Sequence, residues 1–413
     1  MEGHSYKYSD LSISLTKKIS KTEKKNNGIY FTPPETIYKN IELLQPYIKN
    51  IKNVLEPSCG SCEYILALNQ HFKQSENNCN ITGIELNKTI FESIKQYEND
   101  NITLINDDYL KYDFEDPEKF DLVIGNIPFQ IIKKDNVPKM YHNYFDGRPN
   151  IFIIFIIKSL ELLNDGGIMS FVLPKNFLNC LYYNKTRQHI AKNYIILNII
   201  ECSDDKYLET QQDTIILNIR NEKPNTTSPY TLVISEYTIF GTQNNITKLK
   251  HLYNNSKTLN DLGFKVNVGT IVWNQHKNLL TNDSNKTLLV YSSDIKNNQL
   301  SITKYSNNEK KNYINKTGET EPLLVINRGY GVSSYNFNYC IINENTNINY
   351  LIENHLICIK YIESLSKEQL IDKYKQIINS FKNKKTTEFI NIYFGNNAIN
   401  TTELCKILPI YDI

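Results

Sequence analysis

The chain has 413 residues, of which 40% are hydrophobic and 22% are charged, and its formal net charge is +2. This length allows two domains, and this composition is typical of a globular protein rather than a disordered or strongly basic one. The longest apolar run, Ile151–Ile157, is far shorter than the roughly 20 residues of a membrane-spanning helix, and the N-terminus lacks the apolar core of a signal peptide. We therefore expect a cytoplasmic protein, or one of the virion or host cytoplasm if it is viral, that has no membrane partner and is not secreted.

Eight cysteines are scattered along the chain, and Cys59 and Cys62 form its one close pair. A structural zinc site needs four suitably spaced ligands, which this pair does not supply. We therefore predict small buried thiols and no metal site.

The first segments of the chain differ in character. Residues 1–27 are polar and rich in lysine, which predicts a flexible N-terminal arm. The stretch that follows is typical of a helix start, with Thr32 as the N-cap and Pro33 at the first helical position. We expect that helix to continue to about Ile48.

From Asn53 onward, apolar runs alternate with amphipathic segments, which is typical of a mainly parallel, doubly wound α/β sheet. A polar, turn-rich stretch at 222–229 then marks a boundary between domains 28–225 and 226–413. Seven strands are predicted in the first of these domains, at 53–56, 81–86, 102–105, 120–125, 167–173, 195–200 and 214–219, with helices at about 62–72, 87–98, 151–163 and 184–192.

The second domain is less periodic, and its pattern predicts a mixed α+β fold. Strand-like runs occur at 230–235, 288–291, 323–326 and 355–359, and an amphipathic helix is predicted at 367–381.

Polar side chains stand at the ends of the first three predicted strands, where open α/β sheets bind their ligands. The turn Glu56-Pro57-Ser58-Cys59-Gly60 lets backbone approach a ligand closely, and Glu85, which precedes Leu86, is suited to ribose hydroxyls. Asp108 can accept from an exocyclic amine, and the ring of Tyr109 can cover a purine. The three strand ends predict an adenosine-bearing ligand, while the lack of pyrophosphate-binding motifs disfavours NAD and ATP.

The fourth predicted strand ends in the tetrapeptide Asn126-Ile127-Pro128-Phe129. The Asn126 side-chain oxygen and the Ile127 carbonyl can accept the two N–H groups of an aromatic amine, which favours its nucleophilic form and offsets the developing positive charge. The Phe129 ring can stack on the base. We interpret this tetrapeptide as the catalytic element that holds a nucleic-acid base while its amino group is methylated.

In content and order, these stretches resemble the γ-class amino-methyltransferases of type II restriction–modification systems, over about residues 28–220. The resemblance implies a Rossmann-like seven-stranded methyltransferase sheet, S-adenosyl-L-methionine as cofactor, and transfer of methyl to adenine N6 of flipped bases in double-stranded DNA. It further implies a C-terminal DNA target-recognition domain and, as a candidate partner, a cognate restriction endonuclease that acts separately.

The resemblance also assigns roles to residues. Tyr207 lies where the family often supplies a second aromatic against the flipped base, and Trp273 and Arg328 lie in stretches similar to the recognition domains. The implied cofactor contacts are Tyr30, Thr32, Pro33, Glu56, Pro57, Ser58, Cys59, Gly60, Glu85, Leu86, Asp108, Tyr109 and Asn126.

Two positions depart from the family pattern, Cys62 in place of the usual Gly and Ile127 in place of the usual Pro. The form Asn-Ile-Pro-aromatic also occurs in rRNA adenine dimethyltransferases. RNA adenine methylation, and a catalytically degenerate fold that only binds DNA, therefore stay as alternatives.

Overall fold

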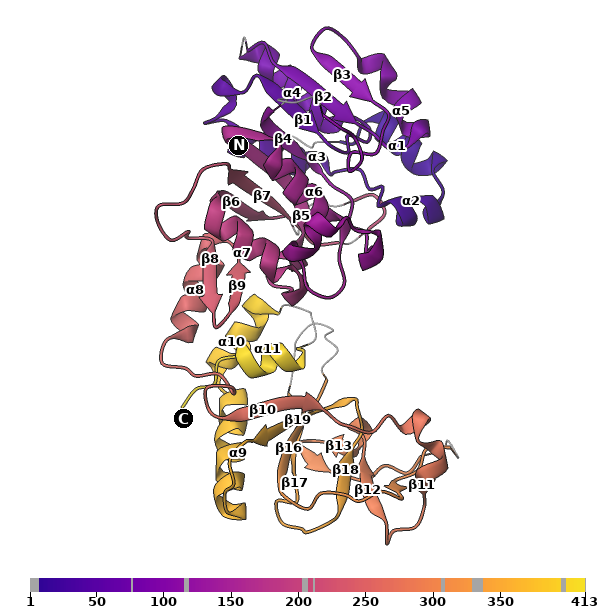
Figure 1. Ribbon diagram of the computed structural model, residues 1–413, viewed down its shortest axis with the longest axis vertical. Coiled ribbons are helices and arrows are strands. Elements are labelled where there is room, and N and C mark those ends of the chain that lie inside the picture. The colour runs from indigo at the N-terminus through magenta and orange to yellow at the C-terminus, as the bar shows by residue number, and fades with distance from the viewer. Residues whose placement is uncertain are drawn as a thin grey trace. The chain divides into compact units, whose positions relative to one another are not determined.

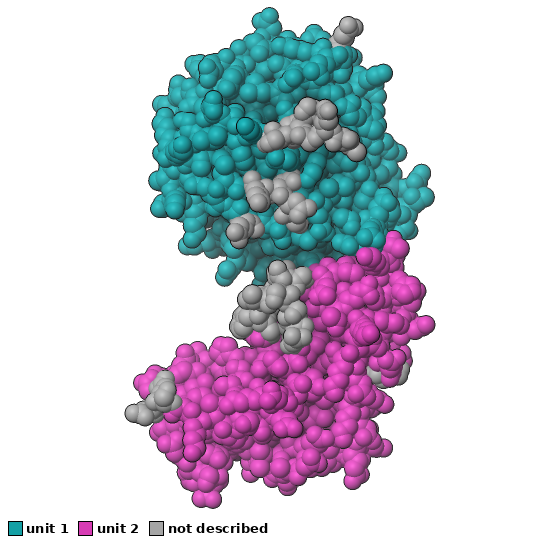
Figure 2. All heavy atoms as spheres, turned by 180° about the vertical axis from the view of Figure 1, so that it is seen from behind, with its two compact units in different colours: residues 1–246 teal, residues 247–413 magenta. Residues whose placement is uncertain are grey.

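The computed structural model describes residues 7–75, 77–114, 119–202, 207–210, 212–305, 309–328, 337–394 and 399–412. The chain divides into two compact units, residues 1–246 and 247–413 (Figure 2). The division follows a hairpin of strands β8 (Thr231–Ile234) and β9 (Tyr237–Phe240), whereas the sequence placed the boundary before it. Within the described ranges, no helix combines the length and apolar character needed to cross a membrane.

A seven-stranded sheet forms the centre of the first unit, with the strand order β3-β2-β1-β4-β5-β7-β6 (Figure 1). Neighbouring strands are parallel except that β7 runs antiparallel to both β5 and β6. The predicted α/β fold is thereby confirmed, and each predicted strand overlaps an observed one. The strands are β1 (Asn53–Glu56), β2 (Asn80–Ile84), β3 (Ile102–Ile105), β4 (Phe120–Asn126), β5 (Leu163–Pro174), β6 (Ile195–Glu201) and β7 (Thr214–Arg220).

Helices cover both faces of this sheet, because successive strand side chains point to opposite sides. On β4, Leu122 and Ile124 belong to a buried cluster with helices α1, α3, α4 and α5, while Val123 belongs to another cluster with α6 and α7. The helices are α1 (Asp10–Lys18), α2 (Lys21–Asn27), α3 (Pro34–Leu44), α4 (Glu63–Gln74), α5 (Lys88–Ile94), α6 (Ile151–Glu161) and α7 (Asn184–Asn193); α8 (Gln243–Tyr253) crosses the division between the units.

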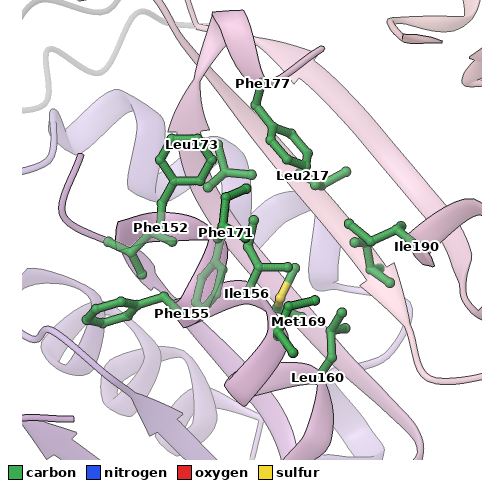
Figure 3. Packing of buried hydrophobic residues seen from close by; sticks show 14 of the residues in the cluster. Phe152, Phe155, Ile156, Leu160, Met169, Phe171, Leu173, Phe177, Ile190 and Leu217 are labelled. Carbon is green, nitrogen blue, oxygen red and sulfur yellow. The ribbon is translucent and has the colours of Figure 1, made fainter. Parts of the chain in front are cut away.

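Helix α6 contains the longest apolar run of the chain and is buried on nearly all sides, as expected of a helix without a polar face. Figure 3 shows Phe155 and Ile156 of this helix packed among Met169 and Phe171 of β5 and Leu217 of β7. This packing holds α6 against β5, the strand next to β4, and so supports the end of β4.

Residues 7–27 are folded, and the prediction of a flexible arm is wrong for them; residues 1–6 lie outside the described residues. Leu15 and Ile19 are four residues apart among polar neighbours, and both are buried in the apolar cluster that includes α3, α4 and α5. The hydroxyls of Ser9 and Ser12 each donate to Glu63 Oε1 at 2.5 Å. Two apolar anchors and one shared carboxylate thus dock a segment whose composition is mostly polar.

The second unit is a mixed α+β structure, as predicted. It contains two four-stranded sheets, with orders β10-β19-β16-β17 and β11-β15-β12-β18, and a β13–β14 hairpin. Its elements are β10 (Phe264–Val268), β11 (Leu280–Thr281), β12 (Thr287–Val290), β13 (Ile295–Lys296), β14 (Gln299–Leu300), β15 (Tyr313–Ile314), β16 (Leu323–Asn327), β17 (Tyr339–Ile342), β18 (Tyr350–Ile352), β19 (Leu356–Tyr361), α9 (Lys367–Phe381), α10 (Lys384–Tyr393) and α11 (Thr401–Lys406).

Candidate active site

A cavity of about 420 Å³ lies where the carboxyl ends of β1, β2, β3 and β4 meet, and we call it the first cavity. Its size is within the usual range for a small-molecule site, roughly 300–1,000 Å³. The residues that line it are Asn27, Gly28, Ile29, Tyr30, Phe31, Pro57, Ser58, Gly60, Glu85, Leu86, Asn87, Lys88, Ile90, Asp107, Asp108, Tyr109, Asn126, Pro128 and Phe155.

The carboxylate of Glu85 joins two loops in the floor of this cavity. Its Oε2 accepts from the backbone N–H of Gly60 at 2.9 Å, and its Oε1 accepts from that of Asn87 at 2.7 Å. Burial raises the pKa of Glu85 to about 7, although both hydrogen bonds act to lower it. A fixed carboxylate with remaining acceptor capacity is suited to a ligand that offers hydroxyl donors, such as a ribose.

Two aromatic residues and a carboxylate, Tyr109, Phe155 and Asp108, also line this cavity. The Tyr109 hydroxyl is hydrogen-bonded to Ser159 Oγ at 2.8 Å, and the Tyr109 ring centroid lies 4.9 Å from that of Phe155. Asp108 accepts from the backbone N–H of Leu110 at 3.1 Å, which fixes the orientation of its carboxylate. Flat apolar surface beside a carboxylate acceptor fits a purine that carries an exocyclic amine.

Asn126 is the last residue of β4 and lies at the edge of this cavity. Its side-chain Nδ2 donates to the Tyr30 carbonyl at 3.1 Å, and its own carbonyl accepts from Ser58 Oγ at 3.3 Å. Because the amino end of the amide is bonded to Tyr30, the oxygen Oδ1 points the opposite way. The side chain is therefore held as an oriented acceptor.

A second cavity, of about 450 Å³, adjoins the first. Gly28, Tyr30 and Asn126 line both cavities, so Asn126 stands in the wall that they share. The residues of the second cavity are Lys25, Asn26, Gly28, Tyr30, Asn126, Ile127, Phe129, Gln130, Ile131, Tyr207, Thr210 and Gln212.

Three aromatic residues, Tyr30, Phe129 and Tyr207, and a backbone segment line the second cavity. Phe129 and Tyr207 both line it, and the Phe129 ring is braced edge-on by Phe152, with centroids 6.3 Å apart. The Ile127 side chain is only 2% exposed and belongs to the apolar core, although this residue also borders the cavity. A pocket that is lined by aromatic rings and carries amide and carbonyl acceptors fits a planar base.

Most of the predicted cofactor residues meet in the first cavity, but Thr32, Pro33, Glu56 and Cys59 do not line it. Thr32 and Pro33 are buried at the start of α3, where Pro33 rather than Thr32 is the N-cap and the helix begins one residue later than expected. The Cys59 side chain is buried in the apolar cluster that includes α1, α3, α4 and α5.

Glu56 lies behind Gly125, where a Cβ atom would be 3.4 Å from the Glu56 Cγ. Its side chain is 3% exposed, and burial, followed by the nearby Cys62, raises the pKa of its carboxyl well above the ordinary range. These four side chains lie behind the surface of the cavity, and their contacts with the cofactor stay predictions.

Sequence reasoning missed several lining residues. Asn87, two residues after Glu85, is the N-cap of α5, and its side chain accepts from the backbone N–H of Ile90. An Asn at the start of a predicted helix could have been recognised in the sequence. Asn27 was missed because residues 1–27 were expected to form a flexible arm. Phe155 comes from α6 and left no local signal.

Trp273 and Arg328, the predicted DNA contacts of the second unit, lie in different surroundings. Trp273 is half-buried beside an apolar cluster, with Lys277 Nζ 5.8 Å from its ring centroid. Arg328 is exposed directly after β16, and Gly329 and Tyr330 lie outside the described residues. Their contacts with DNA stay predictions.

The cysteine pair is buried, and Cys62 adopts a left-handed conformation with φ of 64° at the N-cap of α4. This is the kind of backbone that favours glycine, which agrees with the Gly of the family pattern at this position. Among the described residues, no group of three or more His, Cys, Asp or Glu side chains could hold a metal ion.

The model of the Eco57I restriction-modification methylase family matches residues 4–207. The chain is 25% identical over 412 residues to the type II methyltransferase M.CvrRI of Paramecium bursaria Chlorella virus XZ-6E, which covers 98% of this chain and 99% of that protein. Over 417 residues it is likewise 25% identical to the modification methylase CviBIII of Paramecium bursaria Chlorella virus NC1A, with the same coverage. A solved class I S-adenosylmethionine-dependent methyltransferase of Listeria monocytogenes is 20% identical with a TM-score of 0.45, and the match covers 53% of this chain and 67% of that one.

Proposed function

The chain belongs, through residues 4–207, to the restriction-modification methylase family, and on this premise we propose that it is a site-specific DNA adenine methyltransferase. It transfers methyl from S-adenosylmethionine to adenine N6 in duplex DNA. The observation that carries the proposal is the position of Asn126, which lines both the first cavity, of a size that fits a nucleoside, and the second cavity, which aromatic residues line.

The first cavity fits the cofactor by the chemistry of its donors and acceptors. Glu85 accepts from the ribose hydroxyls, Asp108 accepts from the adenine amine, and Tyr109 and Phe155 cover the ring. Tyr30 and Asn126 lie at the end of the cavity that faces the second one. When bound, S-adenosylmethionine supplies a methyl group on a positively charged sulfur.

The second cavity receives the target base. Adenine N6 cannot be reached inside a stacked duplex, so the base is flipped out, and Phe129 and Tyr207 hold its ring. Asn126 Oδ1 and the Ile127 carbonyl accept the two N–H groups of N6. These acceptors draw the nitrogen toward tetrahedral geometry and direct its lone pair to the methyl group.

The reaction needs orientation and charge stabilisation more than a strong base. The N6–carbon bond forms as the sulfur–carbon bond breaks, so positive charge moves from sulfur to N6. The same two acceptors stabilise that charge, and N6 then loses a proton to water. Asn126 is thus an acceptor of hydrogen bonds throughout and never a proton acceptor.

The length of the similarity supports DNA rather than RNA as the substrate. M.CvrRI and CviBIII, which bear the names of a type II methyltransferase and a modification methylase, are matched over 99% of their lengths, second unit included. This favours double-stranded DNA over RNA and supports the second unit as the target-recognition part. A cognate restriction endonuclease, if present, acts as a separate protein.

The test is to express the protein and to map N6-methyladenine in host DNA by single-molecule sequencing. Asn126→Ala should lower turnover by about 100-fold or more, the usual cost of removing one group that stabilises transition-state charge. Calorimetry should find S-adenosylmethionine affinity within a few-fold of wild type. Asn164→Ala is the control. It removes an amide at the start of β5 that donates a hydrogen bond to Asp121 at the start of β4, far from the carboxyl end of β4, and it should leave turnover unchanged.

Near wild-type turnover in Asn126→Ala would refute the mechanism. Wild-type protein that binds S-adenosylmethionine but methylates rRNA instead of duplex DNA would support the RNA alternative. Failure to bind S-adenosylmethionine would support a degenerate DNA-binding fold.

A further inference from the structure

One lysine of the N-terminal helices differs from its neighbours. Lys17, Lys18, Lys21 and Lys25 are exposed, whereas Lys24 is 4% exposed. Its Nζ lies 2.5 Å from Glu209 Oε2 and donates to the Thr16 carbonyl at 2.7 Å. Lys24 is therefore a buried ammonium with an ionic partner far away in the sequence.

Burial of an ammonium is costly unless a partner compensates the charge and its hydrogen bonds are satisfied. Glu209 is 30% exposed at its side chain, and Lys24 is 5% exposed at its own, so the pair is partly screened from water. The backbone that carries Glu209 must therefore stay within reach of α2. A pair of this kind acts on geometry more than on net stability.

The segment 207–210, which carries Glu209, also forms part of the second cavity. Tyr207 and Thr210 line that cavity on either side of Glu209. A second tie runs in parallel, since the Tyr8 hydroxyl is hydrogen-bonded to the backbone of Leu208. The N-terminal residues thus hold this segment at two neighbouring positions.

Lys24 is also next in the chain to other residues that line the second cavity. Lys25, Asn26 and Gly28 follow it in the chain and line the second cavity. The side chain of Gln130, next to the catalytic tetrapeptide, donates to the Asn26 carbonyl. The Lys24–Glu209 ion pair therefore links the end of α2, which lines the second cavity, to the segment that carries Tyr207.

We propose that Lys24 and Glu209 form a positioning pair that holds Tyr207 at the second cavity and so sets how firmly the flipped adenine is retained. Neither side chain touches the base. The inference rests on the proposed function, because it takes the ligand of the second cavity to be the target adenine. It also gives the folded N-terminal helices a role in base capture.

Hydrogen exchange of the free protein tests the pairing without reference to activity. Lys24→Met keeps an apolar stem and removes the charge, and Glu209→Gln removes the charge of the partner. In both variants the backbone amides of 207–210 should exchange at least about ten times faster, while those of α6 keep their protection. Lys21→Met, at an exposed site of the same helix, is the matched control and should leave 207–210 unchanged.

Base capture is measured with duplex DNA that carries 2-aminopurine at the mapped target adenine. The fluorescence increase on binding should fall several-fold in Lys24→Met and Glu209→Gln, and turnover should fall with it. Affinity for S-adenosylmethionine should stay within twofold, because neither residue lines the first cavity. The double variant should be no worse than Lys24→Met alone, since the two side chains act as one unit.

The outcomes separate this inference from the proposed function. No methylation of DNA by the wild-type protein would refute the proposed function. Wild-type methylation together with unchanged 2-aminopurine signal and unchanged exchange of 207–210 in both variants would refute the positioning pair. If Lys24→Met misfolds, Glu209→Gln decides; loss of α6 protection and of S-adenosylmethionine binding in that variant would mean general support of the fold and would overturn the inference.

Discussion

Gly28 and Pro128 lie so close together that a Cβ atom on Gly28 would be 2.9 Å from the Cβ of Pro128. Gly28 ends α2 with φ of +65°, and the same built Cβ would be 3.3 Å from the backbone nitrogen of Phe129. The end of α2 thus packs directly against the proposed catalytic tetrapeptide. A side chain at position 28 would have to displace either the end of α2 or the tetrapeptide.

Gly28→Ala should therefore lower methyl transfer by at least about ten-fold. The left-handed conformation alone costs about 1–2 kcal/mol for a residue with a Cβ, and the displaced Pro128 adds an effect on Asn126 and Phe129. Turnover on mapped DNA sites and urea unfolding give the two quantities.

The matched control is Gly166→Ala, at a glycine with φ of +77° and no atom within 4 Å of the built Cβ. It should lose similar stability and keep its turnover. Equal turnover in the two variants would mean that contact with Pro128 does not position the tetrapeptide.

Affinity for S-adenosylmethionine should depend on pH through Glu85. Burial raises its pKa to about 7, and the ionised carboxylate is the better acceptor for ribose hydroxyls. Affinity should thus be highest above pH 7 and should fall toward ten-fold per pH unit below it. Calorimetry between about pH 5.5 and 8.5 measures this slope, and Glu85→Gln should bind weakly with the slope removed; a flat profile in the wild type would contradict the assignment.

The same group should make the free protein less stable as pH rises. Its folded pKa, about 7, exceeds the ordinary value of 4.5, so the folded state holds a proton that the unfolded state has lost between these values. The contribution of Glu85 to the free energy of unfolding should therefore decline from about pH 4.5 to pH 7. The difference between wild type and Glu85→Gln in urea unfolding should follow that decline, and a difference constant with pH would refute it.

Ile127 should tolerate substitutions that keep its carbonyl. Its side chain is 2% exposed in the apolar core, so Ile127→Val should cost about 0.5–1.5 kcal/mol of stability. Ile127→Pro, which restores the family pattern, should lose more stability. Both should keep turnover within a few-fold, because the carbonyl is the group that we propose to meet the substrate. A large loss of turnover in Ile127→Val at nearly unchanged stability would assign a role to the side chain.

Arg187 should be a main support of the first unit. It is fully buried in α7, where Nε donates to the Thr238 carbonyl at 2.6 Å and Nη1 to the Phe177 and Cys180 carbonyls at 2.9 Å each. Arg187→Met leaves these carbonyls without their donor and should lower the free energy of unfolding by about 3 kcal/mol or more. Lys185→Met, at an exposed position of the same helix, is the control, and equal melting temperatures would contradict the prediction.

The meeting of polar residues at one edge of the sheet could be predicted because its signals are local. The apolar run of β4 ends at Asn126 and Pro128, and Glu85 and Asp108 follow strands in the same manner, so strand ends and polar residues coincide in the sequence itself. Parallel pairing then brings these ends to one edge.

Other features depended on contacts between distant segments. Burial of Lys24 requires Glu209, and nothing near Lys24 distinguishes it from the exposed lysines around it. The β8–β9 hairpin belongs to the first unit because Arg187 binds the Thr238 carbonyl, whereas the polar stretch before the hairpin suggested a boundary there. The Glu56 side chain is buried and does not line the first cavity, which a motif alone does not specify.

The wall that the two cavities share has a consequence for inhibitor design. Since Gly28, Tyr30 and Asn126 border both, the proposed cofactor and the proposed target base would lie next to each other. A single molecule that joins an adenosine moiety to a second adenine through a short bridge should span both sites and gain affinity from the linkage. Such a bisubstrate compound would discriminate against methyltransferases whose acceptor pocket is not aromatic-sided.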